Sequence, residues 1–487
     1  MNKYFTGISI MTTCIFISNV NAQDYGAQID ALQNEVLKMK QKINQSSKED
    51  KAYFVKGKGL SIKSTDGKYS FQIKGRLMYD MAAIVHDEKT VNGVTSDYNS
   101  SPLGDSEGWG SEFRRLRFTI KGEVGNGWGF ALQPDFADSP DMGADRSVVF
   151  KDAHIYKKIK GFGKIFVGNN KVAGGMYENT SSNAIVFNER PMHNEIMNFG
   201  NRTGITYDTD GVFGNVFHGR MSFFSGTESA FEQNINLGDA KTGSHQAWGY
   251  SFAGQYTFID QNDIKAMVGV HYGHQNLKSM DNNDYDTASA YINGIHTISD
   301  KALDLGDWDG VPALEGFTFY GPQALVIYKN LMLQGEYQRG YYELEQLTGE
   351  TQEEDYDIHG WSIGGLWTVT GEQMKYSGKK GKIGGLKCKR HCTQVKLQYQ
   401  YADAVDRPSK NTSAANNGGP FRDDGGQGSV WKGGINHFFN SNVKLSLECS
   451  HGNYEYDDGI AEDTTNGYGE NGQSEVSAIE ARLHLKF

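Results

Sequence analysis

The sequence predicts an all-β protein: a transmembrane barrel of sixteen antiparallel strands with long extracellular loops, preceded by a short N-terminal coiled-coil helix. Three observations lead to this prediction. Glycine (60 of 487 residues) and aromatic residues (12%) are abundant although mean hydropathy is low, at -0.58. Short segments alternate apolar and polar residues along most of the chain. The connections between these segments alternate long and short, as they do in bacterial outer-membrane barrels.

The composition argues against several other classes. No stretch of the mature chain has the roughly 20 consecutive apolar residues that a membrane-spanning helix needs. Disordered chains lack the aromatic and β-branched residues that are frequent here, and collagen needs a Gly-X-Y period and far more than 8 prolines. A barrel accounts for the low hydropathy, because only alternate strand residues are apolar.

The first 22 residues have the pattern of a secretory signal peptide. Lys3 precedes an uncharged, mostly apolar stretch over residues 4–20, and Ala22 ends a small-residue cleavage site. We expect residues 1–22 to be removed on export, which leaves 47 basic and 59 acidic residues. An exported barrel of this kind is expected in the outer membrane of a Gram-negative bacterium.

Residues 23–45 have a heptad pattern. Apolar residues recur at alternating intervals of four and three, at Tyr25, Ile29, Leu32, Val36, Met39 and Ile43. This spacing predicts a short coiled coil between copies of the chain, although an amphipathic helix lying on another surface has a similar pattern. In isolated peptides these core residues favour a dimer, and a trimeric barrel could override so short a segment. Residues 46–68 are expected to form a linker.

From residue 69 to the C-terminus, residues 69–487, the hydrophobic period is two. In one segment Val395, Leu397 and Tyr399 alternate with polar residues, which predicts a strand with one face toward lipid. Sixteen such segments occur, an even number as single-chain bacterial barrels require. They lie near residues 70–80, 113–122, 127–136, 149–157, 163–169, 203–208, 215–224, 247–258, 263–273, 318–328, 331–340, 358–370, 393–402, 429–438, 443–452 and 475–487.

One connection departs from the alternation of long extracellular loops and short periplasmic turns. Residues 371–392 should form a short turn but number 22 and are rich in lysine. Either they form an unusual periplasmic excursion, or strands are missed or misplaced there. An oxidising periplasm favours a disulfide between Cys388 and Cys392. Together with His391 these cysteines are too few for a metal site, and no metal or cofactor is expected.

The polar face of the strands carries more basic than acidic residues, and in a barrel this face lines the pore. Six inward positions are acidic: Asp80, Asp135, Asp152, Glu336, Glu448 and Glu480. Eleven are basic: Lys74, Arg76, Arg115, Arg117, Lys121, Arg220, Lys265, Lys396, Lys444, Arg482 and Lys486. We take the first six of these as the candidate anion-attracting lining, because Arg and Lys in a pore favour anions. The alternative is that the cations pair with lumenal acids and stiffen the wall.

The third long connection, residues 170–202, is the candidate constriction loop. It contains Lys171, Arg190 and Arg202. A sixteen-stranded barrel leaves an aqueous channel, and a long loop folded inward would narrow it. A surface loop is the alternative.

Several short motifs resemble the phosphate-selective porin O and P family. They occur in order across about residues 60–487 and comprise FRRLRFTIKG (113–122), WGF (128–130), PDFA (134–137), VGNNK (167–171), ENTSS (178–182), FNER (187–190), GW (360–361), TGE (370–372) and GGINHFFN (433–440).

This resemblance implies a sixteen-stranded trimeric outer-membrane porin whose third loop forms a constriction. It also implies a ladder of arginines that leads anions to a lysine-rich site. Arg115, Arg117 and Lys171 fall on matching motif positions. Residues 172–175 read VAGG, whereas family members usually have an acidic residue, proline and phenylalanine there.

We therefore predict passive diffusion of small, preferentially anionic solutes, with phosphate as one candidate, through a basic-lined pore. The predicted partners are these solutes, outer-membrane lipid and further copies of the chain in a homotrimer; nucleic acid is not expected. A non-specific or sugar-permeable porin is the first alternative, although few aromatic residues face inward. An enzyme is disfavoured because H-E-x-x-H and a phosphate-binding glycine loop are missing from the sequence. An envelope tether that acts through the coiled coil is a third reading.

Overall fold

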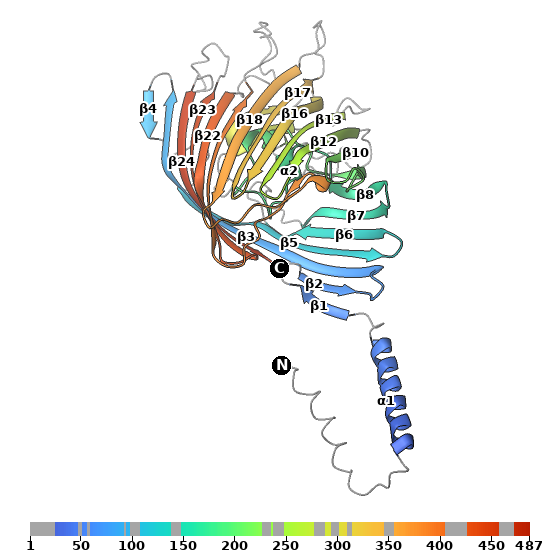
Figure 1. The fold of residues 1–487 in the computed structure, drawn as a ribbon. Helices are drawn as coiled ribbons and strands as arrows, with labels where there is room; N and C mark the ends of the chain where they lie inside the picture. The colour runs from blue at the N-terminus through green and yellow to red at the C-terminus, as the bar shows by residue number, and fades with distance from the viewer. Residues whose placement is uncertain are drawn as a thin grey trace.

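The computed structural model describes residues 25–46, 51–55, 59–91, 94–97, 108–137, 148–225, 235–236, 248–276, 288–293, 301–308, 314–344, 355–404, 426–456 and 472–487. Sixteen antiparallel strands close into one barrel (Figure 1), because each pairs with the next and the last pairs with the first. Their bounds are β3 (Tyr69–Val91), β5 (Trp109–Val124), β6 (Trp128–Asp135), β7 (Val149–Ile159), β8 (Gly163–Lys171), β9 (Asn201–Asp208), β10 (Phe217–Ser225), β12 (Trp248–Asp260), β13 (Ile264–Asn276), β16 (Leu314–Tyr328), β17 (Leu331–Leu344), β18 (Asp355–Thr368), β21 (Cys392–Asp403), β22 (Gly426–Phe438), β23 (Val443–Tyr456) and β24 (Gly472–Lys486).

The predicted number and order of strands are confirmed, but several strands run further than their alternation indicated. β3 was expected over residues 70–80 and continues to Val91. Its pairing with β24 shifts register between Ser477 and Ala478, and His86 beyond this point is exposed. A bulge of this kind moves side chains from one face to the other, so the period of two is lost while the backbone pairing continues.

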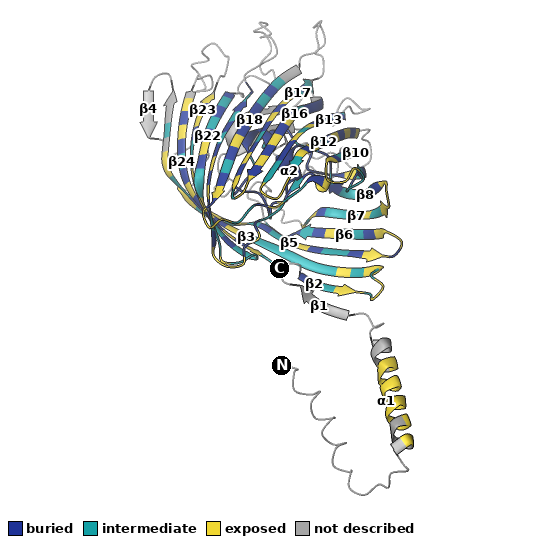
Figure 2. Cartoon of the chain, viewed as in Figure 1, coloured by how far each residue is buried: buried dark blue, intermediate teal, exposed yellow. Residues whose placement is uncertain are grey.

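Burial in the barrel is inverted relative to a soluble protein. On β21, Val395 and Leu397 are exposed on the outer face, whereas Gln394, Lys396 and Gln398 are buried in the interior. Figure 2 shows the same alternation of exposed and buried residues along the neighbouring strands. An apolar outer face suits hydrocarbon, and the polar interior must then find its hydrogen-bond partners inside the barrel.

The N-terminal region joins the barrel through a hairpin. Helix α1 (Tyr25–Ser46) extends away from the barrel (Figure 1) and is followed by β1 (Lys51–Val55) and β2 (Gly59–Lys63). β2 pairs with the start of β3 over four residue pairs, beside the point where the backbones of Gly75 and Phe487 exchange hydrogen bonds of 3.1 Å.

Residues 46–68 are thus not only the linker that we expected. β2 continues the line of β24 beyond Phe487. It pairs with the start of β3, which β24 does not reach, so the backbone groups at this edge of β3 have a partner strand. A strand that pairs over only four residues is too short to be recognised from a hydrophobic period. The expected signal peptide, residues 1–22, lies outside the described residues.

The long connections hold further short elements that the sequence did not predict. β4 (Val94–Asp97) pairs with β3, and β11 (Ile235–Asn236), β14 (Ala288–Asn293) and β15 (Lys301–Trp308) form a separate sheet. β14 lies against α3 (Met192–Ile196), a short helix of the third long connection. Among the described helices, none combines the length and the apolar character needed to cross a bilayer.

The connection between β18 and β21, residues 369–391, contains no missed barrel strand. β18 pairs directly with β21 over ten residue pairs. The connection instead forms β19 (Tyr376–Ser377), the 3-10 helix η3 (Gly378–Lys380) and β20 (Lys382–Ile383), and a disulfide joins Cys388 to Cys392. Met374, Ile383 and Leu386 are buried against apolar residues of the inner wall. Of the two possibilities, it is an excursion, and it folds into the barrel.

The burial pattern predicts that the cost of an outward charge depends on its depth. Ile363, in the middle of β18, and Val369, just past its end, are equally exposed on the outer face, at 46% and 47%. Ile363→Arg should destabilise the barrel by about 2–4 kcal/mol and Val369→Arg by about 0–1 kcal/mol, because the first arginine lies in hydrocarbon. Equilibrium urea unfolding in lipid vesicles measures both. Equal costs would show that β18 does not cross the bilayer at this depth.

Candidate functional site

The third long connection, residues 172–200, lies inside the barrel. It carries α2 (Met176–Asn179) and α3, and nearly all of its residues are buried. Its backbone is held from widely separated strands: the Ala173 amide donates to Ser222 Oγ on β10 at 3.0 Å, and the Met192 amide donates to Gln400 Oε1 on β21 at 3.0 Å. The loop therefore crosses the interior rather than covering the surface.

Two inward carboxylates on the wall act as anchors for this loop. Glu336 on β17 accepts the Tyr177 amide at 3.1 Å. Glu448 on β23 accepts the Asn188 amide at 3.1 Å and the Lys396 ammonium at 2.7 Å. The Lys396–Glu448 ion pair is fully buried, so its charges are compensated by each other and by the loop.

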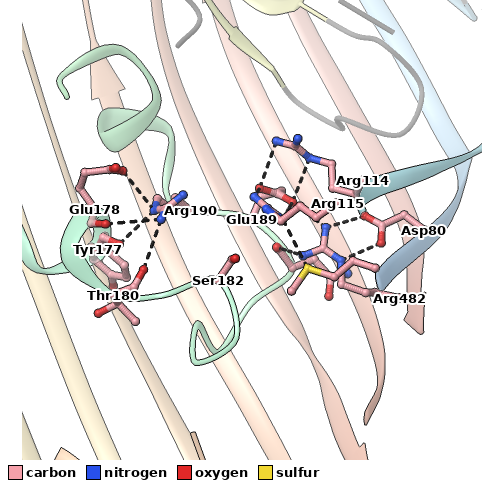
Figure 3. Close-up of polar contacts among 12 residues, drawn as sticks. Asp80, Arg114, Arg115, Tyr177, Glu178, Thr180, Ser182, Glu189, Arg190 and Arg482 are labelled. Atoms are coloured by element: carbon pink, nitrogen blue, oxygen red, sulfur yellow. Dashed lines mark hydrogen bonds and ion pairs between the residues drawn. The ribbon is translucent and has the colours of Figure 1, made fainter. Parts of the chain in front are cut away.

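Glu189 ties the loop to β5 and to β24, the neighbour of β23 in the wall. Arg115 on β5 donates to both carboxylate oxygens, at 3.0 and 2.9 Å, and Arg114 also donates to both, at 3.2 and 3.4 Å. Arg482 on β24 bridges Glu189 and Asp80, so one carboxylate of the loop joins three strands (Figure 3). The pairing of Arg115 is the structural role that the sequence analysis left open as an alternative.

Arg190, the next residue, braces the loop internally. Its guanidinium lies 3.3 Å from Glu178 Oε2 and donates to the carbonyl oxygens of Tyr177 at 3.0 Å and Thr180 at 3.3 Å (Figure 3). Lys171 also pairs with Glu178. These contacts hold α2 and the segment after it in one conformation.

A cavity of about 310 Å³ lies between this loop and the wall. Three acidic residues line it: Asp152, Asp208 and Asp210. Ten basic residues line it: Arg76, Arg115, Arg117, Lys151, Lys164, Lys171, Arg190, Arg220, Lys380 and Lys382. The cavity is therefore strongly basic, although the whole chain has a formal charge of -11.

Part of this charge is compensated by ion pairs. Arg117 pairs with Asp135 at 2.5 Å, Arg220 with Asp208 at 3.0 Å and Lys164 with Asp210 at 3.3 Å. Adding Asp135, Glu178 and Glu189, which lie behind the lining, gives six acids against ten basic residues. An excess of positive charge therefore remains in the cavity.

Arg76 contributes most clearly to this excess. Its guanidinium donates to the hydroxyl of Ser182, and among the described residues no carboxylate lies within 4.0 Å of it. Lys382 on β20 adds to it: burial, with the Arg220 cation nearby, lowers the pKa of Lys382 to about 8, so most of its charge is kept at neutral pH.

The sequence-predicted residues divide into two groups. Arg76, Arg115, Arg117, Arg220, Lys171 and Arg190 all line the cavity. Lys74 and Lys121 lie nearer the start of β3 and the end of β5 and are not part of its lining. Arg202 is almost fully buried and donates to the carbonyl of Asn201 at 3.0 Å.

Four basic residues of the lining were not predicted from the sequence: Lys151, Lys164, Lys380 and Lys382. Lys151 precedes Asp152, which was predicted to face inward, so strict alternation places Lys151 on the outer face. The register between β6 and β7 shifts between Gln133 and Pro134, and both Lys151 and Asp152 reach the cavity. A bulge cannot be seen in the apolar pattern. Lys380 and Lys382 belong to the irregular connection, whose only signal was its basic run.

The other side of the interior is rich in neutral amides, beside the buried charged residues Glu336 and Lys396. Strands β12 to β21 bury a set of glutamines: Gln255, Gln275, Gln323, Gln334, Gln338, Gln394, Gln398 and Gln400. The positive charge is thus concentrated on one side of the loop. Within the described part of the chain, no three His, Cys, Asp or Glu side chains form a group that could hold a metal ion.

The anchoring contacts predict a specific stability effect. Glu448→Gln should destabilise the barrel by about 3–5 kcal/mol, because the buried Lys396 loses its charge partner. The control is the double substitution Lys396→Met with Glu448→Gln, which removes the buried charge and should recover much of the loss. Urea unfolding in vesicles gives both values. A double variant as unstable as Glu448→Gln would contradict a charge-pair role.

Several solved structures are partly similar to the chain. The outer membrane channel DcaP of Acinetobacter baumannii has a TM-score of 0.48 and 11% sequence identity, covering 87% of this chain and 99% of that chain. An anion-selective porin from Comamonas acidovorans has a TM-score of 0.47 and 14% identity, covering 86% and 100%.

Comparison at the sequence level gives one partial relative and one family. An uncharacterized protein of Caulobacter vibrioides is 25% identical over 142 residues, which span 29% of this chain and only 25% of that relative. The family model described as phosphate-selective porin O and P matches residues 89–487. Because this match covers most of the chain, with all of the barrel strands except β3, of which it covers only the end, the protein belongs to the phosphate-selective porin O and P family.

Proposed function

We propose that the protein is an outer-membrane porin for passive diffusion of small, preferentially anionic solutes. The observation that carries this proposal is the charge of the cavity, where ten basic residues face three acidic ones. Fixed positive charge in a confined aqueous space raises the local concentration of anions and excludes cations. The third loop crosses the barrel interior. Solutes would then pass through the cavity on its basic side.

Phosphate is one candidate solute. The cavity lining includes hydroxyl groups beside the cations, those of Ser181 and Ser182. An oxyanion needs several hydrogen-bond donors in addition to charge, and arginine matches phosphate geometry well. Hydroxyls beside arginines therefore suit an oxyanion.

A sugar-permeable pore fits these residues less well. Stacked aromatic rings along the lumen would be expected of such a channel. Contrary to the expectation from the sequence, the inner wall does bury Phe224, Phe317 and Phe319, which pack against Phe199 of the third loop. Phe166, however, is the one Phe, Tyr or Trp among the residues that line the basic cavity. The porin family to which the chain belongs and its closed barrel both indicate a channel rather than an enzyme.

We also propose a homotrimer, with α1 as part of its contacts. Leu32, Val36 and Met39 of the heptad pattern are 65%, 43% and 53% exposed in the single chain. An apolar stripe of this kind is covered when helices from other copies pack against it. The outer barrel face, which is apolar over its strands, then contacts lipid.

Reversal potentials in a planar bilayer under a KCl gradient test the proposed anion preference. The wild type should favour chloride over potassium, and Arg76→Gln should lower this preference because it removes a cavity cation that makes no direct ion pair with a carboxylate of the described residues. Arg339→Gln is the matched control: it makes the same charge change on the exposed outer face, where Arg339 pairs with Asp357.

Two outcomes would contradict the proposal. A cation-preferring wild type would exclude an anion porin. Equal effects of Arg76→Gln and Arg339→Gln would show that the cavity is not the ion path. Phosphate added to the chloride solution distinguishes the solutes: block of chloride current at low phosphate concentration supports an oxyanion site, and unchanged current points to general anion passage.

A further inference from the structure

Two histidines meet at the end of the barrel that carries the short turns. His391 is the last residue before β21, and His437 lies one residue before the end of β22, next to the short turn 439–442. The Nδ1 atom of His391 lies 3.4 Å from the Nε2 atom of His437. His391 is exposed, His437 is partly exposed, and neither lines the basic cavity. The proposed anion path therefore gives no reason for this pair.

The position of His391 is fixed by its surroundings. The disulfide between Cys388 and Cys392 closes a short loop that contains it, and its backbone amide donates to the Phe439 carbonyl oxygen at 3.4 Å. Its φ is 50°, in the left-handed region that few residues other than glycine adopt. The Phe439 ring lies edge-on to the His391 and His437 rings, with centroids 6.4 and 5.0 Å away. A site held in this way loses little conformational freedom when a ligand binds.

The orientation of His437 is set by a hydroxyl on the neighbouring strand. Thr393 of β21 pairs with His437 of β22, and Thr393 Oγ1 lies 3.0 Å from His437 Nδ1. A histidine that binds a metal usually donates its second ring N–H to an oxygen, which sets the tautomer and the direction of the ring. When Nδ1–H donates to this hydroxyl, the lone pair of His437 lies on Nε2, the atom that faces His391.

The distance between the two nitrogens indicates what can lie between them. Donor–acceptor distances of ordinary N–H hydrogen bonds end at about 3.2 Å, so 3.4 Å is long for a direct contact. Two nitrogens bound to one tetrahedral zinc ion, each at about 2.0–2.1 Å, lie about 3.3–3.4 Å apart. Adjacent nitrogens of a square-planar copper(II) ion would be closer, at roughly 2.9 Å. The spacing therefore suits a tetrahedral ion.

The chemistry of the donors selects the same class of ion. Imidazole nitrogen suits zinc and its neighbours in the transition series, whereas magnesium and calcium ions take six or more oxygen ligands. Lys389 and Arg390 next to His391 are exposed, so water and salt screen their repulsion of a cation. No third His, Cys, Asp or Glu completes the group within the described part of the chain. The remaining two positions of a tetrahedral ion are then open to water.

We propose that His391 and His437 bind a divalent ion of the zinc class at the short-turn rim of the barrel, with water in the two open positions. Thr393 is a positioning residue, which acts through the His437 ring. The bound ion joins the last residue of the long connection to β22. The site is separate from the proposed anion path, and the two proposals stand or fall independently.

A zinc titration of the untagged, chelator-treated protein in detergent micelles tests the site, with a chromophoric chelator as competitor. The wild type should bind one Zn²⁺ per chain. His391→Asn and His437→Gln should each weaken this affinity by about tenfold or more, because one ligand is lost. Asparagine is chosen at residue 391 because it tolerates a positive φ.

His451→Gln is the matched control for the titration. This histidine lies on β23, where its Nδ1 atom is 2.9 Å from the Ser477 hydroxyl, and its loss should leave zinc affinity unchanged. Circular dichroism and heat-modifiable migration establish that each variant folds. Zinc affinity unaffected by both His391→Asn and His437→Gln would overturn the proposal. A wild type that binds no zinc would also overturn it and leave the pair as a hydrogen bond.

Cobalt spectroscopy tests the geometry and the role of the threonine. Co²⁺ in the wild type should give the intense visible bands of a four-coordinate ion, and a weak six-coordinate spectrum would overturn the tetrahedral arrangement. Thr393→Val should weaken zinc affinity by about tenfold while keeping the cobalt bands, and Thr393→Ser should restore it. Unchanged affinity in Thr393→Val would overturn the positioning role.

The wild type alone gives an independent measurement if a variant does not fold. Zinc should protect His391 and His437 from modification by diethyl pyrocarbonate, as read by mass spectrometry, while His451 is modified equally with and without the metal. Equal modification of all three histidines in the two conditions would overturn the proposal.

Discussion

The structure depends on one constraint: a closed barrel in lipid must point its apolar residues outward and its polar residues inward. Every strand backbone is then paired with a neighbour and no edge faces hydrocarbon. The interior consequently holds many buried polar and charged side chains, which are costly unless they are paired or hydrated. The third loop supplies many of the missing partners, since its backbone amides bind Glu336 and Glu448 and its own Glu189 binds three arginines.

Because buried charges must be paired or hydrated, the cations of the interior fall into two kinds. Lys396 and Arg482 hold the loop in place and are fully engaged by carboxylates. Arg76, Lys380 and Lys382 have no carboxylate among the described residues within pairing distance and face a cavity. Only the second kind is available to a passing anion. On the far side of the loop the buried residues are mostly neutral amides, so the attraction for anions acts on one side only.

The sequence predicted the barrel well because alternation is a local signal that each strand carries independently. It predicted the cavity only in part. Arg115 has the same inward pattern as Arg76, and only the fold shows that Glu189, 74 residues away, neutralises it. Lys151 was missed because a bulge breaks the alternation. The seat of residues 371–391 depends on apolar residues from four strands meeting inside the barrel, a coincidence that no local pattern reports.

The most direct test of the basic cavity as the anion path is anomalous diffraction from crystals of the protein soaked in bromide. The structure predicts bromide peaks inside the barrel near Arg76 and Lys382, with no comparable peaks along the glutamine-lined side. Bromide confined to the outer surface, or spread evenly around the interior, would contradict a one-sided anion path.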